Sequence, residues 1–490
     1  MRMKRKEIRE VYEQGPEAVV NLVESLLAVI ERTAFLDEEN EKLKKRIQEL
    51  EGRLGMNSRN SHRPPSSDGL SKPPASRKKG GRPRGGPKGH KGHTLQMVDD
   101  PHRVIDHTPP KCSACGRGLT AVEATACERR QVFDLPPLQV EVTEHRSQVK
   151  ICPECGGENK AAFPAGVDAP TQYGPAIKAT LSYLTAYQLI PLKRSCEMLS
   201  DLCGVDVCEA TILNTNGTLF SNLAGVEEAI KQGLADCPVA GFDETGIRVE
   251  GKTVWLHVAS TDARTCYGAH QKRGRQATED IGILPRFTGT AVHDFWKPYL
   301  TYDCSHALCC AHLLRELTFL EEKAGQAWAG KMKKLLRGAH KAVQKARTEK
   351  LDRLEPAQIN RFKKRYRQIL DEGFEVNPLP PAPPGPAKRG RKRKSKARNL
   401  LERLRDYQDD VLTFVSDFSV PFDNNQAERD LRMAKVQQKI SGTFRSWEGA
   451  HIFCRIRSYI SSARKNHIPV IQAMKDAFEG RPFMPMPEST

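Results

Sequence analysis

The fold is decided by the stretch Val239-Ala-Gly-Phe-Asp-Glu-Thr-Gly-Ile-Arg-Val-Glu-Gly-Lys-Thr-Val-Trp-Leu-His-Val258. Its first four residues predict a short buried strand that ends on Asp243. The apolar alternation on either side of Glu250-Gly251 predicts two antiparallel strands, and a third is expected at Thr265 to Ala269. Because side chains alternate across a strand, Asp243 and Glu244 point to opposite faces. We expect Asp243 to be the one that joins a site.

Two further carboxylates lie in settings that complement Asp243. The segment Gly289-Thr-Ala-Val-His293 predicts another short strand, which ends on Asp294. Further on, Pro421 to Arg432 predicts the start of a helix, with Asp423 or Asn424 as N-cap and Glu428 near the first turns. Carboxylates from two strands and a helix suit two hard cations that clamp a phosphodiester. Each acid also has a plainer interpretation, as a turn residue or as an ion-pair partner one helical turn from an arginine.

Several ordered motifs together resemble the bacterial DDE transposases of the insertion sequence sixty-six family, from about residue 17 to the C-terminus. The motifs are Gly241-Phe-Asp-Glu-Thr245, His293-Asp-Phe-Trp-Lys-Pro-Tyr299, Cys310-Ala-His-Leu-Leu-Arg-Glu-Leu317, Asn424-Asn-Gln-Ala-Glu-Arg-Asp-Leu-Arg432 and Ser441-Gly-Thr-Phe-Arg-Ser446. The resemblance implies an RNase H-like core in which Asp243, Asp294 and Glu428 bind two Mg²⁺ or Mn²⁺ ions. It also implies cleavage and joining of transposon ends, and companion proteins encoded by the same element.

The amino-acid composition indicates what kind of partner the protein binds and where in the cell it acts. The 490 residues include 78 Lys and Arg against 60 Asp and Glu, and the net charge of +18 favours polyanions such as double-stranded DNA. An apolar run of eighteen residues is absent, and the first residues lack the apolar core of a secretion signal. We therefore expect a cytoplasmic, nucleoid-associated protein with no membrane partner. The 14 cysteines are then expected to be thiols and metal ligands rather than disulfides.

Residues 17–54 keep a seven-residue repeat and predict a coiled coil. Asn40 falls in the row that β-branched residues occupy in parallel dimers, where a buried polar side chain fixes register and favours two strands. We expect a homodimer through this segment, the alternative being an amphipathic helix packed on its own chain. The other row consists of Leu22, Val29, Leu36, Leu43 and Leu50.

Two basic stretches predict contacts with DNA phosphates. Residues 56–95 are rich in Ser, Pro, Gly and basic side chains, which predicts a disordered linker. Within it Gly80 to Gly86 resembles an AT-hook core, in which Arg82 and Arg84 enter a narrow minor groove. A solvated basic linker is the alternative. The second stretch follows a Pro-rich spacer, and its expected phosphate contacts are Lys388, Arg389, Arg391, Lys392 and Arg393. A targeting signal or a solvated loop is the alternative.

Two cysteine pairs, Cys112 with Cys115 and Cys152 with Cys155, have the spacing of a structural zinc site. Each pair supplies two thiolates from one tight turn, and four thiolates complete a tetrahedral site. The alternation over Val132 to Val149 predicts a β insert between the pairs, giving a zinc-ribbon-like module. Cys127 has no partner at this spacing and is expected in the core. The resemblance to the family also implies a zinc-binding segment here.

Between this module and the catalytic core lies a helical stretch, with helix-turn-helix spacing around Gly204. Its second helix, from about Cys208 to Leu219, would enter a major groove, or both helices would pack beneath the core.

Farther along, Cys304, Cys309 and Cys310 lie near His306 and His312, and the pattern of an apolar strand entering a helix favours core packing over a zinc site.

Four side chains of the core are expected near DNA. His312 and Arg315 lie one helical turn apart and are expected to face the active site or a DNA phosphate, the alternative being an ordinary polar helix face. Arg432 and Arg445 follow Glu428 and are expected to hold phosphates beside the metals.

We therefore expect a multidomain α+β protein that acts as a DNA transposase. The alternatives are a non-catalytic DNA-binding regulator and a nuclease of the same fold. The expected ranges are 17–54 for the coiled coil, 56–95 for the basic linker, 100–170 for the zinc-binding module, 171–235 for the helical DNA-binding domain, 236–325 and 401–478 for the two parts of the RNase H-like core, 326–400 for a helical and basic insertion, and 479–490 for a tail.

Overall fold

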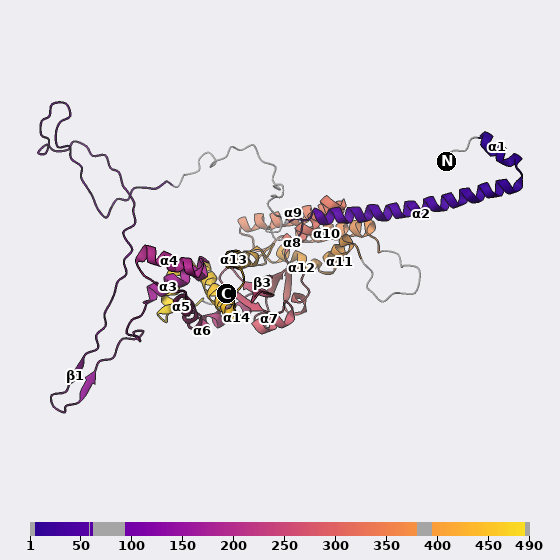
Figure 1. Ribbon diagram of the computed structural model, residues 1–490. Helices are drawn as coiled ribbons and strands as arrows, with labels where there is room; N and C mark the ends of the chain where they lie inside the picture. The colour runs from indigo at the N-terminus through magenta and orange to yellow at the C-terminus, as the bar shows by residue number, and fades with distance from the viewer. Residues whose placement is uncertain (1–4, 58, 62–93, 380–393, 486–490) are drawn as a thin grey trace. The chain divides into compact units, whose positions relative to one another are not determined.

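The computed structural model describes residues 5–57, 59–61, 94–379 and 394–485 (Figure 1). The chain forms two compact units. The first, called here the sheet unit, comprises residues 1–73, 164–195 and 208–490. The second, the cysteine unit, comprises residues 74–163 and 196–207. The expected DNA contacts Arg82, Arg84, Lys388, Arg389, Arg391, Lys392 and Arg393 lie outside the described residues.

A five-stranded sheet in the order β5-β4-β3-β6-β7 organises the sheet unit. Strand β6 is parallel to β3, and β7 is parallel to β6, whereas β3, β4 and β5 are antiparallel. The hairpin between β3 and β4 turns at Glu250 and Gly251, whose φ angles of 53° and 76° suit a type I′ turn. The bounds are Val239–Val249 for β3, Lys252–Ser260 for β4, Thr265–His270 for β5, Thr290–His293 for β6 and Ser305–Leu308 for β7.

Strand β3 corrects one expectation. The sequence predicted a short strand that ends on Asp243, but β3 is a single strand of 11 residues with Asp243 in its middle, opposite Val258 of β4. The reason is that β4 pairs with β3 from Gly241 to Val249 and supplies ladder partners well past the acid. The polar residues of the motif therefore lie within the sheet.

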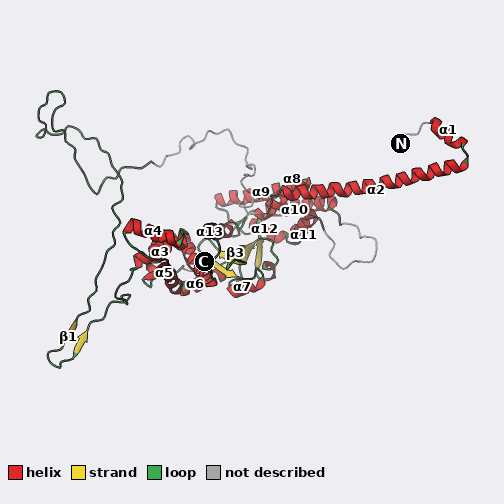
Figure 2. Ribbon diagram, in the orientation of Figure 1, coloured by secondary structure: helices red, strands yellow, loops and turns green. Residues whose placement is uncertain are grey.

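Helices surround the strands of the sheet (Figure 2). Before the sheet come α3 (Pro175–Ser182), a π-helical turn (Tyr183–Tyr187), α4 (Leu192–Cys203), α5 (Glu209–Asn222) and α6 (Ala224–Ala235). Between β5 and β7 come α7 (Arg275–Ile281) and two 3₁₀ turns (Leu284–Arg286 and Tyr299–Thr301). After β7 come α8 (Cys310–Ala324), α9 (Ala327–Thr348), α10 (Pro356–Val376), α11 (Lys396–Asp406), α12 (Gln408–Ser416), α13 (Asn425–Ser441), α14 (Trp447–Lys465) and α15 (Val470–Phe478).

Apolar burial ties these helices to the sheet. Ile230 of α6 and Ile456 of α14 share one cluster with Ala291 of β6, and α3 and α5 also contribute to it, so these three helices before the sheet share a core with it. A second cluster joins Leu308 of β7 to the helices α8 to α12, for example through Met332. The helical and basic insertion expected at residues 326–400 contains a pair of long helices, α9 and α10.

The N-terminal segment contains α1 (Arg5–Glu13) and the single long helix α2 (Pro16–Leu54). Along α2 the apolar residues of the heptad rows are exposed, including Leu36 at 47% and Leu43 at 58%. Just past its end, Arg59 Nη2 lies 2.9 Å from Glu322 Oε1 of α8. Across the described helices, none combines the length and the apolar run that a membrane span requires.

Among its described residues, the cysteine unit contains little regular structure apart from residues 196–203 of α4. Its two strands, β1 (Val149–Ile151) and β2 (Glu158–Lys160), form an antiparallel pair. The β insert expected over Val132 to Val149 is wrong, because Val149 is the only residue of that stretch in a strand. Alternation alone forms no strand where a neighbouring edge is missing. Cys127, expected in the core, is exposed.

Candidate active site

The register of β3 and β6 brings two acids to the same level. Val239 pairs with Thr290 and Gly241 with Val292, so the parallel ladder runs at a constant offset. Continuing that offset past the last pair puts Asp243 level with Asp294, four residues beyond Val239 and Thr290 respectively. Asp294 is held by the backbone N–H of Trp296, which donates to Oδ1 at 2.9 Å. Both carboxylates therefore stand just past the end of one parallel ladder.

The third acid, Glu428, lies in the first turns of α13, and Asn424 fixes where that helix begins. Asn424 occupies the N-cap position, but its side chain does not cap the helix. Instead, its buried amide donates to the Phe242 carbonyl at 2.8 Å, one residue before Asp243. A Cβ atom at Gly241 would lie 2.3 Å from Asn424 Oδ1, so only glycine permits this approach. The first turn of α13 is thus fastened to β3.

The pKa of Asp243 reflects both its burial and its acidic neighbours. Burial raises the pKa of Asp243 well above its usual range, and the charges of Glu244, Asp294 and Glu428 raise it further. Like charges in a site of low dielectric favour a cation or a shared proton. The three acids are near enough to interact, but they do not form one tight ligand cluster. In the part of the chain that the structure describes, the one group of three potential ligands within 4.8 Å is Cys309, His312 and Glu428.

His312 and Arg315 of α8 both face Glu428. His312 Nδ1 lies 3.6 Å from Glu428 Oε1, and Arg315 Nη2 lies 3.5 Å from Glu428 Oε2. Cys309, directly before α8, is buried, and its Sγ accepts a hydrogen bond of 3.2 Å from Asn424 N. Burial raises the pKa of the Cys309 thiol to about 12. Cys309 and Cys310 are buried as core packing requires, while His312 lies beside the third acid.

A group that the sequence interpretation passed over surrounds Glu244. Its carboxylate accepts a hydrogen bond of 2.9 Å from Arg273 Nε and another from the Tyr299 hydroxyl. The Arg273 guanidinium lies 4.7 Å from the ring centre of Trp255 and 4.4 Å from that of Trp296. Burial raises the pKa of Glu244, whereas Tyr299 and Arg273 lower it. Strand alternation favours Asp243 over Glu244 as the site residue, so the sequence interpretation does not include Glu244. The aromatic turn that contains Trp296 and Tyr299 is the sequence feature that could have indicated partners for Glu244.

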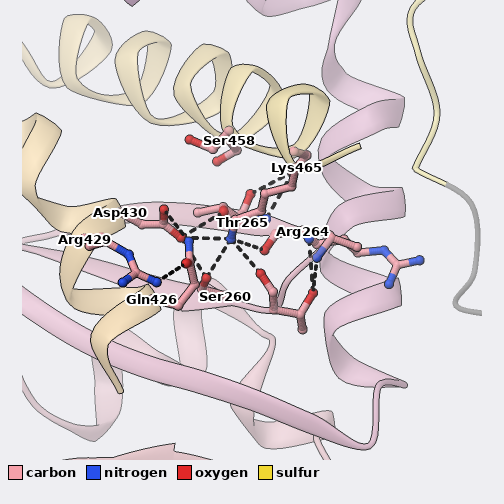
Figure 3. A network of polar contacts seen from close by, with 12 residues as sticks. Ser260, Arg264, Thr265, Gln426, Arg429, Asp430, Ser458 and Lys465 are labelled. Atoms are coloured by element: carbon pink, nitrogen blue, oxygen red, sulfur yellow. Dashed lines mark hydrogen bonds and ion pairs between the residues drawn. The ribbon is translucent and has the colours of Figure 1, made fainter. Parts of the chain in front are cut away.

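A polar network pins α13 to the sheet (Figure 3). Asp430, two residues after Glu428, is the common acceptor on the helix. Its Oδ2 accepts from Ser260 Oγ at 2.7 Å, Thr265 Oγ1 at 3.1 Å and Lys465 Nζ at 2.9 Å. Its Oδ1 accepts from Gln426 Nε2 at 3.1 Å. Ser260, Thr265 and Lys465 lie on β4, β5 and α14 respectively. Their bonds to Asp430 therefore fix the rotation of α13, which carries Glu428.

The other two expected phosphate contacts lie apart from this network. Arg432 on α13 and Arg445 before α14 are exposed. Among the described residues, no ion pair joins either arginine to the three acids. Exposed basic side chains remain available to a polyanion.

The four cysteines of the cysteine unit lie in two matching turns. Gly116 N donates to the Cys112 carbonyl and Gly156 N to the Cys152 carbonyl, both at 2.9 Å. Backbone N–H groups of the second cysteine in each pair lower the pKa of Cys112 and Cys152. The structure does not gather the two pairs into one cluster of ligands among its described residues. Two pairs of cysteines at this spacing are nevertheless the donors that a structural zinc ion requires.

Comparison with protein families gives three matches. The model described as Transposase IS66 family matches residues 170–452. The model described as the zinc-finger binding domain of transposase IS66 matches residues 109–158. A family of unknown function matches residues 6–96. A search of the curated proteins found no match.

Proposed function

The chain belongs to the IS66 transposase family, and on that premise we propose that it cuts the ends of an insertion element and joins them to target DNA by metal-dependent phosphoryl transfer. The observation that carries the proposal is the level placement of Asp243 on β3 and Asp294 directly after β6, with Glu428 on α13 close enough to raise the pKa of Asp243. An arrangement of this kind supports our proposal that the protein is a polynucleotidyl transferase of the DDE type.

The sheet supports an RNase H-like core. Three antiparallel strands are followed by two strands parallel to the first, and helices surround them. We assign residues 236–325 and 401–478 to this core and residues 326–400 to an insertion. The helical segment at 171–235 shares its apolar cluster with the sheet. A DNA-reading role for α5 would therefore use the face opposite its buried Ile212 and Leu219.

Asp243, Asp294 and Glu428 fit two Mg²⁺ or Mn²⁺ ions, because three carboxylates offer hard oxygen ligands and their mutual repulsion calls for positive charge. Such ions supply activation of the attacking oxygen and stabilisation of the leaving oxygen. The chain's own residues position the acids. Arg273 and Tyr299 hold Glu244 beside the site, and the Asp430 network holds the helix that carries Glu428.

The remaining modules would bind and organise DNA. His312, Arg315, Arg432 and Arg445 are proposed to contact phosphates near the metals, and the basic stretches outside the described residues would contact the rest of the duplex. Cys112, Cys115, Cys152 and Cys155 would hold one structural Zn²⁺. The helix over residues 17–54 would form a homodimer by covering its exposed heptad rows. We also propose that the protein associates with the nucleoid in the cytoplasm and acts with companion proteins encoded by the same element.

The test is an assay that scores cutting and joining separately. Purified full-length protein is incubated with Mg²⁺, duplexes that carry the element ends, a target plasmid and the companion proteins of the element. Products joined to the plasmid are the expected result. Cutting without joining would favour a nuclease, and DNA binding with neither reaction would favour a regulator.

A further inference from the structure

We propose that Cys309, His312 and Glu428 form a site for a thiophilic divalent cation, best matched by Zn²⁺, and that its occupation withdraws Glu428 from Asp243 and Asp294. The inhibitory consequence rests on the proposed function.

The geometry of the cluster is close to that of a metal site. One potential ligand atom from each residue lies within 4.8 Å of the other two. Zinc bonds of about 2.0–2.3 Å to sulfur, nitrogen and oxygen in a tetrahedron place the ligand atoms about 3.5 Å apart. Side-chain movements of roughly 1 Å would therefore complete three of the four positions. A water molecule or a substrate oxygen can take the fourth, as in zinc sites with three protein ligands.

The elements on which the three residues lie are already fastened to one another. His312 N donates to the Cys309 carbonyl at 3.2 Å in the first turn of α8. Asn424 N, at the start of α13, donates to Cys309 Sγ at 3.2 Å. These two bonds connect the helix that carries His312 with the helix that carries Glu428. The cluster is thus held by the backbone and does not depend on flexible surface side chains.

One atom of the cluster is left without a hydrogen bond. Glu428 Oε1 is buried and accepts none from any residue that the structure describes, while Oε2 lies near Arg315. The contact of Oε1 with His312 Nδ1, at 3.6 Å, is too long for a hydrogen bond. A buried carboxylate oxygen without a donor is costly, and a cation between these atoms would satisfy it.

The donor types select the ion. Thiolate and imidazole suit Zn²⁺ or Co²⁺, whereas Mg²⁺ prefers oxygen ligands alone. A thiolate from Cys309 and the carboxylate of Glu428 also neutralise the two charges of the ion, which a buried site requires. Cys309 directly precedes α8, where the helix dipole favours negative charge.

The Glu428 carboxylate cannot be a ligand of the zinc site and of the proposed Mg²⁺ site in the same conformation. Zinc held by Cys309 and His312 would draw Glu428 toward α8, and the pair Asp243 and Asp294 would lose its third ligand. Zinc is therefore expected to inhibit the Mg²⁺-supported reaction, and removal of the thiol is expected to relieve that inhibition. A thiophilic ion would in this way hold the protein in a resting state.

Metal binding is measured first, without DNA. Full-length wild type and Cys309→Ser are loaded with Zn²⁺, dialysed, and their bound zinc is counted; a second pair is loaded with Co²⁺ for absorption spectra. The serine hydroxyl can still accept the Asn424 hydrogen bond, so the fold should persist, as thermal unfolding would show. We expect wild type to hold one more equivalent than Cys309→Ser, and the difference spectrum to contain a thiolate-to-cobalt charge-transfer band.

Two further variants test whether the zinc equivalent lost in Cys309→Ser belongs to the proposed site. Cys310→Ser removes the adjacent buried thiol, whose Sγ contacts the Val411 carbonyl, and should bind metal as wild type does. His312→Gln removes a second proposed ligand and should lose the same equivalent as Cys309→Ser. Equal zinc counts in wild type, Cys309→Ser and His312→Gln, with no difference band, would overturn the site whatever the outcome of the joining assay.

The inhibitory role is measured by titrating Zn²⁺ into the joining reaction at fixed Mg²⁺. Cys309→Ser is expected to need at least about tenfold more zinc than wild type for half inhibition, because loss of a ligand weakens metal binding by that order or more. Equal zinc sensitivity would refute the regulatory step. A protein that joins no DNA but loses a zinc equivalent in Cys309→Ser would instead contradict the proposed function and leave the metal site standing.

Discussion

In the sheet unit, Val292 and Leu256 are 1% and 0% exposed, whereas in the cysteine unit Val132 and Leu135 are 92% and 88% exposed. Apolar burial at about 25 cal/mol per Å² can fix the strands and helices of the first unit. The second unit buries too little surface to be fixed in that way. It has two matching cysteine turns instead, within the residues 109–158 that match a zinc-finger family model, so its order is expected to come from zinc. The three acids proposed as catalytic are thus positioned by packing, and the four cysteines proposed as zinc ligands by local turns.

The largest effect is expected from removing a carboxylate of the sheet unit. Asp294→Asn should lower the joining rate by about 10³-fold, or about 4 kcal/mol of activation free energy, because the neutral amide cannot bind a cation as the acid does. Single-turnover joining measures the change, and zinc content should not move. Asp303→Asn makes the same substitution at an exposed position and should leave the rate intact. Comparable rates for Asp294→Asn and wild type would remove Asp294 from the site.

A variant of the cysteine unit should lose zinc, in contrast to Asp294→Asn, which should keep its zinc and lose the joining rate. Cys112→Ser is expected to weaken zinc binding by more than about 10²-fold and to expose residues 94–163 to protease, because one of four thiolates is lost. Zinc analysis and limited proteolysis measure this, and the thermal transition of the sheet unit should stay in place. Cys127→Ser, which replaces an exposed cysteine, is the control. Full zinc content in Cys112→Ser would show that the two pairs do not share an ion.

Breaking the Asp430 network should destabilise the sheet unit. Lys465→Met removes an ammonium group that donates to Asp430 and to the Ser260 hydroxyl. Loss of one partner of a buried ion pair costs about 3 kcal/mol of the free energy of unfolding. Denaturant unfolding measures the loss. The matched change Lys475→Met, on an exposed pair with Glu479, should cost less than about 1 kcal/mol.

The smallest of the four effects concerns Glu244. Arg273→Met should cost about 1–2 kcal/mol of stability, a figure discounted because the Arg273 side chain is 40% exposed although that of Glu244 is 2% exposed. Arg275→Met, which breaks an exposed pair with Glu279, should change stability by less than about 0.5 kcal/mol. Denaturant unfolding again measures both. If both variants lost the same free energy of unfolding, the buried carboxylate of Glu244 would need Arg273 no more than the exposed Glu279 needs Arg275.

Sequence patterns predicted much of the sheet unit. The alternation after Phe242 marked the hairpin, and the apolar run before Asp294 marked β6, because a half-buried strand shows its period in sequence. The same patterns failed at Val132 to Val149, since a strand also needs a neighbouring edge. They also set Glu244 aside, because strand alternation does not show that Arg273 and Tyr299 approach it from other segments.

The sequence by itself determined the family of the chain, most strands of its five-stranded sheet in outline, and the residue types that could bind metal. Only the tertiary structure decided which of them meet. The level of Asp243 with Asp294 comes from the register of a parallel ladder, and the approach of Glu428 comes from Asn424 fitting over Gly241. The cluster of Cys309, His312 and Glu428 joins two helices separated by more than a hundred residues. Local patterns encode the conformation of each segment, but contacts between distant segments depend on how their surfaces pack.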